Sequence, residues 1–589
     1  MIEPRIYRVA FVPALLAVVL AMFSLESRPR PLGQALAADV VFDGPQAAAS
    51  TRAVLAAARD RRAGSRGDLA AARLVAGRFR ARGFEVEADR FEHDAKQLVN
   101  VIGRRAGKSR RQLVVVAPRD AAGVPDASGS AADTAALLEI ARVFEGRPSE
   151  KTLVLASVDG SALGEGGTTR LAEALGDPAL IDGVIVLSGL ATGSGPPRLE
   201  TWSNDTTTAG IGLRRTVAES LRQEVGSVAG RPSVAGQLAR LAFPIGIGGQ
   251  GPLLAAGFDA VRISGDDRPP GASPGGELDE RRLEALGRAL LRSVAALDGG
   301  GTPERGPAGH VIVAGQVMPG WVLSVLALAL LFPALVGSVD AFARSRRRRE
   351  PVGALMLWLA AGVAPFAIGL TLVYALVLTG AVPAPPQAPV APERFPLGGA
   401  EAAALGLVSA TVGLAWIGLR LLVLRAYPGL ADRALPGAGV VVSLVLALAA
   451  LVLWLINPYA ALILAPAVHL WMLATLLEPP PPRKLALALV ALGLLLPGLV
   501  VLYDALALAV GPLGGAWYLL LLVAGGHVGL PLVLVGCVLA GVLGSVVSIA
   551  VSKPPEGAGS VPDTHSVRGP AGYAGPGSLG GTTSALPRR

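Results

Sequence analysis

Cysteine and histidine are scarce in this chain of 589 residues, which has one cysteine, Cys537, and five histidines. A single thiol cannot build a disulfide framework or a thiolate metal site within one chain. Charged residues make up only 16% of the sequence, whereas apolar residues make up 52% and the mean hydropathy is +0.53. This composition is too apolar for one soluble globule and predicts an integral membrane protein.

Positive charge is in excess, and the net charge is +9 at neutral pH. Five arginines of this excess stand in the run from Arg344 to Arg349, directly after an apolar segment. A basic run in that place is a topology signal or a contact for anionic membrane lipid. We therefore expect membrane lipid, and no nucleic acid, as the partner of these arginines.

Apolar runs of near-spanning length organise the chain. The first run, Val9–Leu25, is followed by ordinary soluble sequence, and from Trp321 to Val551 such runs follow one another. The predicted parts are an N-terminal membrane anchor, a linker, a soluble domain, a second linker, a multi-span helical bundle and a disordered tail: Met1–Pro29, Arg30–Gln46, Ala47–Gly300, Gly301–Met318, Pro319–Val551 and Ser552–Arg589.

The bundle should contain seven or eight spans in addition to the anchor, because a bilayer requires about 20 apolar residues per helix. The final stretch, Ala516–Val551, is too long for one span, and the glycines around His527 predict a turn within it. It gives either a short helix plus a full one or a re-entrant segment plus one helix. The total is eight or nine spans, and those before the final stretch are Trp321–Val339, Val352–Leu378, Ala402–Leu424, Val440–Ile456, Tyr459–Leu477 and Leu485–Leu502.

The first apolar run has some features of a secretory signal peptide, because Arg5 and Arg8 precede it and Ala35–Ala37 offers a small-residue cleavage site. That site lies well beyond the run, so we favour an uncleaved anchor. Basic residues gather in every second loop between the predicted spans, and the Arg344–Arg349 run is one of these groups. This pattern predicts that those loops are cytoplasmic. The large domain is then extracytoplasmic, as is the proline-rich loop Val382–Pro396.

The soluble part alternates short apolar segments with amphipathic ones, which predicts an α/β fold, a three-layer sandwich with a mostly parallel sheet. In such a sheet function gathers at the carboxyl ends of the strands, where Pro118, Asp159 and Ser188 are expected. The predicted strands are Leu113–Ala117, Leu153–Ser157 and Val184–Leu187, and the predicted helices are Ala131–Phe144, Thr169–Leu175 and Leu278–Leu297.

Several segments of the soluble part resemble, in order, successive segments of M28-type zinc aminopeptidases. The resemblance covers about Ala47–Leu297 and depends on the order and spacing of several weak matches. It implies a cleft at the strand ends, where that family holds two zinc ions that activate a water for attack on a peptide bond. The segments are Arg62–Phe91, Leu98–Arg104, Ala117–Arg142, Val158–Gly167 and Gly249–Ile263, followed by the closing helix Leu278–Leu297.

Carried over residue by residue, the resemblance implies that the metal-binding positions lack metal ligands. The His of the family's His-x-Asp motif falls on Pro118, and only the Asp is kept, as Asp120, which in the family orients the metal-bound His. We therefore expect a binding cleft without zinc or another cofactor. The bridging Asp, the base, its neighbouring ligand, the next carboxylate and the last His fall on Gly129 (or Ser128 if the alignment shifts by one), Ser161, Ala162, Ser188 and Gln250.

Replacement ligands would make the chain an active zinc aminopeptidase, and this alternative stays open. An ordinary structural role is favoured for each acidic candidate: Asp133 is expected to face out of its helix, Asp159 to cap the turn after its strand, and Glu165 to lie in a glycine-rich loop. The candidate ligands are His93, His310, Asp126, Asp133, Asp159 and Glu165.

The predicted bundle contains His469 inside a span, and an ionisable group at that depth is a functional candidate. A transporter-like bundle with an accessory domain is therefore a second alternative. The plan of the whole chain is similar to that of the Gaa1-type GPI transamidase subunit and of membrane-anchored M28 peptidases. We expect a non-catalytic binding or scaffold module whose ligand is a peptide, a lipid-linked molecule or a partner membrane subunit.

Overall fold

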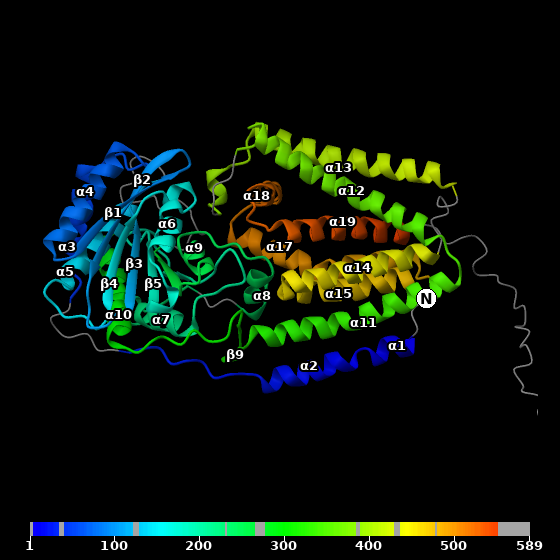
Figure 1. Cartoon of the computed structure of the whole chain (residues 1–589), viewed down its shortest axis with the longest axis horizontal. Helices are drawn as coiled ribbons and strands as arrows, with labels where there is room; N and C mark the ends of the chain where they lie inside the picture. Colours follow the sequence, from blue (N-terminus) through cyan, green and yellow to red (C-terminus); the bar gives the residue numbers. More distant parts are fainter. Residues whose placement is uncertain are drawn as a thin grey trace, which may run out of the picture.

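The chain folds into a soluble α/β domain at one end and a bundle of long apolar helices at the other (Figure 1). The Ala35–Ala37 site, Asp126, Ser128 and the tail Ser552–Arg589 lie outside the described residues. The computed structural model describes residues 4–33, 41–121, 129–229, 233–265, 277–383, 389–428, 436–477 and 480–551.

A seven-stranded sheet forms the centre of the soluble domain, with its strands in the order β1-β2-β4-β3-β5-β7-β6. The pairs β4–β3, β3–β5 and β5–β7 are parallel, and the pairs toward both edges are antiparallel. The central strands are buried because helices cover the sheet. The strands are β1 Glu85–His93, β2 Lys96–Arg105, β3 Gln112–Pro118, β4 Thr152–Val158, β5 Ile181–Ser188, β6 Arg198–Glu200 and β7 Ala260–Ser264.

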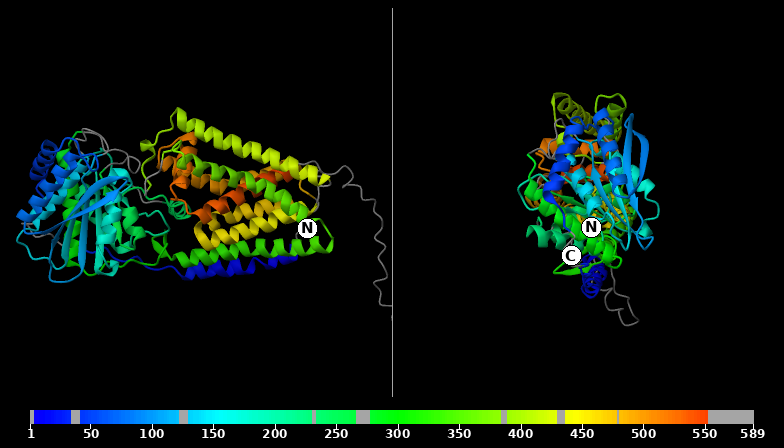
Figure 2. Two further views of the ribbon diagram at one scale, coloured as in Figure 1. Left: turned by 45° about the horizontal axis from the view of Figure 1, so that its top comes forward. Right: turned by 90° about the vertical axis from the view of Figure 1, so that its left-hand side faces the viewer.

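The helices of the soluble domain enclose this sheet, as the two views of Figure 2 show. The predicted three-layer α/β sandwich with a mostly parallel sheet is confirmed. Sequence reasoning missed β1, which is rich in charged residues because it is an exposed edge strand. The helices are α3 Gly44–Ala57, α4 Arg66–Ala81, α5 Ser130–Val143, α6 Gly166–Ala174, α7 Ile211–Val225, α8 Val234–Ala242, α9 Gln250–Ala255 and α10 Glu280–Gly299.

The bundle contains six helices in the described chain that are long and apolar enough to cross a membrane, and the bent pair α16–α17, with 41° between its halves, is a seventh candidate. The final stretch forms a short helix plus a full one, which is one of the two predicted alternatives. The total of eight or nine spans stays a prediction. The bundle helices are α11 Gly320–Arg347, α12 Val352–Leu378, α13 Gly399–Ala426, α14 Pro436–Ile456, α15 Pro458–Leu476, α16 Arg483–Gly493, α17 Leu495–Ala507, α18 Pro512–Ala524 and α19 Leu530–Val551.

The N-terminal apolar segment forms α1 Pro4–Val9 and α2 Val12–Phe23, which pack along α11 (Figure 1). The predicted second linker contains a small hairpin of β8 Val311–Val313 and β9 Gln316–Met318. Glu26, just after α2, pairs with Val317 of this hairpin. The two points at which the chain enters the bundle are therefore tied together.

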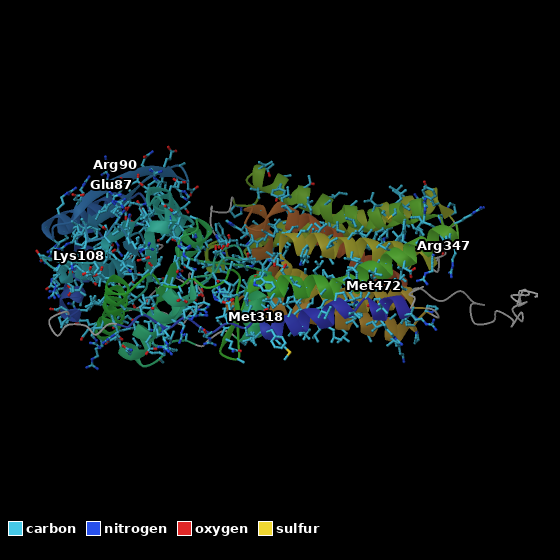
Figure 3. All side chains as sticks on the ribbon, turned by 60° about the horizontal axis from the view of Figure 1, so that its bottom comes forward. Glu87, Arg90, Lys108, Met318, Arg347 and Met472 are labelled. Atoms are coloured by element: carbon cyan, nitrogen blue, oxygen red, sulfur yellow. The ribbon has the colours of Figure 1, made fainter. Side chains whose placement is uncertain are left out.

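The soluble domain contacts the bundle directly through α8. The Asn457 amide, between α14 and α15, donates to the carbonyl oxygens of Leu241 at 2.9 Å and Ala242 at 3.2 Å. Its oxygen accepts from the first backbone N–H groups of α15 and so caps that helix. The basic run that includes Arg347 lies at the opposite end of the bundle (Figure 3).

Candidate functional site

The carboxyl ends of the parallel strands meet at one edge of the sheet, where a cavity of about 110 Å³ lies. Among the positions predicted to form a cleft, Pro118, Asp120, Ser161 and Ser188 are in the cavity wall. The remaining three positions are not in the wall, but each is adjacent in the chain to a wall residue: Gly129 to Ser130, Ala162 to Ser161, and Gln250 to Gly249.

Asp120 holds the loop that follows β4. Its carboxylate accepts hydrogen bonds from the Ser161 hydroxyl at 2.6 Å and from the backbone N–H groups of Ser161 at 3.0 Å and Ala162 at 2.8 Å. Burial raises the pKa of Asp120, and these hydrogen bonds to the ionised form oppose the shift. Asp120 therefore positions the loop that carries the predicted base and ligand positions.

Asp133 does not face out of its helix, so that prediction was wrong. Its side chain is buried, and its two carboxylate oxygens accept from the backbone N–H groups of Gly189 at 2.7 Å and Leu190 at 2.9 Å. Helix α5 is buried on almost every side, so the helical period gives no exposed face at this position. Asp133 fixes the turn after β5 in the cavity wall.

Asp159 caps the turn after β4 as predicted, because it accepts from the Gly160 N–H at 2.7 Å. It also lies 3.7 Å from the guanidinium of Arg119, which forms a two-pronged ion pair with Asp68 at 2.9 and 2.7 Å. The side chains of all three residues are fully buried. This buried ion cluster stabilises the floor beneath the cleft and was not predicted from the sequence.

The two histidines of the outer part lie away from the cavity wall. His93 contacts the Leu163 carbonyl oxygen at 2.9 Å through Nε2, and His310 contacts the Pro307 carbonyl oxygen at 2.9 Å through Nδ1. Burial, together with the nearby Arg214, lowers the pKa of His310 to about 4. Both histidines have structural contacts in the fold.

The donor set of the cleft does not fit the two zinc ions that the resemblance implies. No group of three or more His, Cys, Asp or Glu side chains in the described parts of the chain could hold a metal ion. Asp120 and Asp133 already accept backbone N–H groups. Glu165 is the remaining carboxylate in the wall, and one carboxylate cannot bridge and hold two ions.

Glu165 directly precedes α6 and has a left-handed backbone, φ +60°, which is uncommon for a residue with a side chain. Its carboxylate accepts from the Thr168 hydroxyl at 3.2 Å. Burial raises the pKa of Glu165 to about 7, while the positive charges of Arg262 and Arg394 oppose the shift. Glu165 therefore changes charge near neutral pH in the wall of the cleft.

Replacing Glu165 by Gln should remove a pH dependence of stability. Between about pH 4.5 and pH 7 the folded protein keeps a proton on Glu165 that the unfolded chain releases, so wild-type stability falls as pH rises through this window. Relative to the variant, the wild type should lose up to about 3 kcal/mol between pH 5 and pH 8. Thermal unfolding of both proteins at the two pH values measures this difference.

The matched control is Glu173→Gln, an exposed change on α6. This control should keep the wild-type pH dependence. If Glu165→Gln and wild type lose stability in parallel as pH rises, the raised pKa of Glu165 is contradicted.

Arg262 of β7 also lines the cavity and is only 5% exposed. Its Nε has no hydrogen-bond partner within the described residues, and the charges of Glu200 and Glu165 attract its guanidinium without forming an ion pair with it. Gly248, with φ +107°, packs against it so closely that a Cβ there would lie 2.5 Å from an Arg262 nitrogen. Burial lowers the pKa of Arg262. A buried guanidinium in this state is poised to bind an anionic group.

The connection between α12 and α13 of the bundle forms one side of the cavity. Pro389, Val390, Ala391 and Arg394, from the connection between α12 and α13, are in its wall. Arg394 donates to the Ala162 carbonyl oxygen at 2.9 Å, which ties this segment to the loop after β4. The connection turns toward the soluble domain in Figure 1. The described residues 389–394 of the predicted proline-rich loop therefore contribute to the wall of the cleft.

Helix α18 holds the same segment in place. The Trp517 indole N–H donates to the Phe395 carbonyl oxygen at 3.0 Å, and the Tyr518 hydroxyl donates to the Val390 carbonyl oxygen at 2.9 Å. We call residues 389–395 the closing segment. Through this segment the cleft is linked mechanically to the bundle.

His469, the candidate in the bundle, uses both ring nitrogens in helix contacts. Nδ1 lies 2.5 Å from the Tyr7 hydroxyl, and Nε2 lies 2.8 Å from the Leu330 carbonyl oxygen. It therefore ties α1 and α11 to α15. It also borders a mostly apolar cavity of about 830 Å³ between α15 and α17, and the transporter-like alternative stays a prediction.

No protein-family model matches the sequence, and no curated protein matches it. Solved structures similar to the chain include a glutaminyl cyclase from an Acidobacteriales bacterium, the zinc aminopeptidase BSAP from Bacillus subtilis and a leucine aminopeptidase precursor from Bacteroides thetaiotaomicron. They are 18%, 12% and 16% identical, with TM-scores of 0.36, 0.34 and 0.32. The matches cover 47%, 43% and 43% of this chain and 100%, 95% and 97% of the respective structures.

Proposed function

We propose that this protein is a membrane-anchored, non-catalytic binding module whose strand-end cleft binds a peptide through its terminal carboxylate. The observation that carries the proposal is Arg262, a buried cation in the cleft wall whose guanidinium has no ion pair within the described residues. A planar guanidinium matches the two oxygens of a carboxylate, and such a charge-assisted pair is strong where water is excluded.

A peptide is favoured because the cleft already accommodates one. The closing segment lies in it, and Arg394 bonds a main-chain carbonyl of the cleft loop. The remaining cavity of about 110 Å³ is smaller than the about 300 Å³ at which ligand pockets begin. A ligand peptide must therefore displace the closing segment, which acts as an internal competitor.

We also propose that the domain faces away from the cytoplasm. The basic run Arg344–Arg349 ends α11 at the end of the bundle opposite to the soluble domain (Figure 3). Short basic loops favour the cytoplasmic side, which supports an extracytoplasmic cleft.

Peptide binding tests the proposal on the full-length protein in detergent. The probe is a fluorescently labelled peptide with the sequence of Pro389–Phe395, PVAPERF, with a free carboxyl terminus. The opened variant combines Arg394→Ala and Tyr518→Phe, which remove one side-chain donor at each end of the closing segment. It should bind the probe about tenfold more tightly than wild type. The reason is that the closing segment no longer occupies the cleft, so a larger fraction of the protein molecules can bind the probe. Fluorescence anisotropy measures the affinity.

The control is Arg170→Gln, a partly exposed change on α6 outside the cavity wall, which should bind the probe as wild type does. Absence of probe binding by the opened variant, with its unfolding midpoint retained, would contradict the proposal. Two zinc ions per chain together with hydrolysis of aminoacyl chromogenic substrates would instead establish the active aminopeptidase. We expect no metal-dependent hydrolysis of these substrates, so that adding a chelator does not change the rate.

A further inference from the structure

We propose that a second cavity of the soluble domain, beside α7, binds a phosphate or phosphate-ester group. This cavity of about 670 Å³ lies between α7, α8, the turn of the β8–β9 hairpin and the segment that follows α2. The proposal is independent of the strand-end cleft, since the two cavities share no wall residue. The basic side chains in its wall are Arg28, Arg214, Arg215 and Arg222.

The charge in this cavity is strongly one-sided. In the described part of the wall, four arginines accompany one carboxylate, that of Glu219, which is paired with Arg222 at 2.8 Å near the exposed rim. Arg215 donates to the backbone carbonyl oxygens of Arg28 and Pro29, which neutralise no charge. Within the described residues, the guanidinium groups of Arg214 and Arg215 therefore have no acid of the wall as an ion-pair partner.

Arg214 is the central group of this cluster. No hydrogen bond or ion pair of its side chain is found within the described residues. Burial, together with the positive charges of Arg28 and Arg215, lowers the pKa of Arg214 to about 10, while Asp259 opposes the shift. Like charges gathered around a partly buried guanidinium cost free energy, and an anion between them would remove that cost.

Phosphate fits this cluster better than a carboxylate does. Guanidinium groups bind phosphate oxygens in pairs, and a phosphate offers three oxygens and up to two charges to the surrounding donors. The volume of about 670 Å³ lies in the range of small-molecule sites and exceeds what a bare phosphate needs. The hydroxyl groups of Thr201 and Ser233 in the same wall can contact the organic part of an ester, whereas the Gln237 amide is already bonded to the backbone of Ile312.

The cavity lies close to the membrane surface. Arg28 follows the last residue of α2, Phe23, by five residues, and Gly315 of the hairpin turn precedes the first residue of α11, Gly320, by five. Five residues span at most about 18 Å. The phosphate therefore comes either from the headgroup of a phospholipid or from a soluble phosphate ester.

Two arms of one experiment separate these sources, both with the full-length protein. In the first arm, glycerol 3-phosphate and inorganic phosphate are titrated into protein in phosphatidylcholine nanodiscs. In the second arm, nanodiscs of phosphatidylcholine alone are compared with nanodiscs doped with phosphatidic acid. The thermal unfolding midpoint reports binding, because a ligand of the folded state raises it.

Arg214→Gln and Arg215→Gln should each weaken binding at least about tenfold, which is the effect of losing one charge-assisted contact. Arg78→Gln, an exposed change on α4, should bind as wild type does. Should Arg214→Gln fail to fold, Arg28→Gln on the segment after α2 provides the same test.

A midpoint raised by the soluble probes assigns a soluble phosphate ester, and a midpoint raised by phosphatidic acid alone assigns a lipid headgroup. The proposal is overturned if neither arm raises the midpoint. It is overturned as well if the folded arginine variants respond as strongly as wild type does.

Discussion

Asp68→Ala should lower the free energy of unfolding of the soluble domain by about 3–5 kcal/mol. The change leaves the guanidinium of Arg119 buried without the partner whose two oxygens it contacts at 2.9 and 2.7 Å. Asp159, at 3.7 Å, cannot replace that pair because its own oxygens accept the backbone N–H groups of Gly160 and Val99. Denaturant unfolding of the full-length protein, followed by near-ultraviolet circular dichroism, measures the loss.

Two further variants separate the buried charge from a general effect of mutation. Arg62→Gln removes an ion pair with Asp60 of similar length, 2.8 Å, but on the exposed surface, and it should leave the unfolding curve unchanged. Adding Arg119→Met to Asp68→Ala should restore much of the lost stability, because the orphaned charge is then gone. An equal loss in the single and double variants would show that the packing of Asp68, and not its charge, is what matters.

The central sheet could be predicted from the sequence because its strands are short apolar runs with turn signals between them. β3, β4 and β5 were found in this way. β7 was missed because its sequence, AVRIS, carries an arginine in the middle, and an arginine ordinarily marks an exposed position. Arg262 is instead buried, and a local pattern cannot show that.

The wall of the cleft could be predicted in part, because the carboxyl ends of parallel strands meet at one edge whatever the loops contain. Pro118 and Ser188 follow from that rule, whereas Asp120 was expected only from the resemblance, and Asp159, which the rule also placed there, is not in the wall. The closing segment could not be found, since it lies more than 200 residues further along the chain and its contact with the cleft depends on how the bundle docks. The error for Asp133 has a related cause: its exposure depends on the other elements around α5 and not on the period of the helix.

The closing segment joins the bundle to the cleft by hydrogen bonds at both of its ends. Trp517 and Tyr518 of α18 hold the segment at two carbonyl oxygens, and Arg394 joins it to the loop that Asp120 fixes. A shift of α18 that breaks these bonds would open the cleft, and a peptide in the cleft would release the segment toward the bundle. The two effects are thermodynamically reciprocal.

Arg262→Gln in the opened variant should weaken binding of the free-acid peptide PVAPERF at least about thirtyfold, the equivalent of about 2 kcal/mol. The reason is that the buried guanidinium is the group we assign to the terminal carboxylate. The same peptide with an amidated terminus is the matched ligand control. It should bind weakly to the opened variant, and Arg262→Gln should change its affinity little, so that the preference for the acid over the amide disappears with Arg262.

The preference for the acid should also depend on pH. Glu165, whose pKa is about 7, is neutral below that value and competes for the positive charge of Arg262 above it. The ratio of acid to amide affinities should therefore be larger at pH 6 than at pH 8 and should lose this dependence in Glu165→Gln. If Arg262→Gln weakens acid and amide equally, the arginine only shapes the cleft, and a terminal carboxylate is not what the cleft recognises.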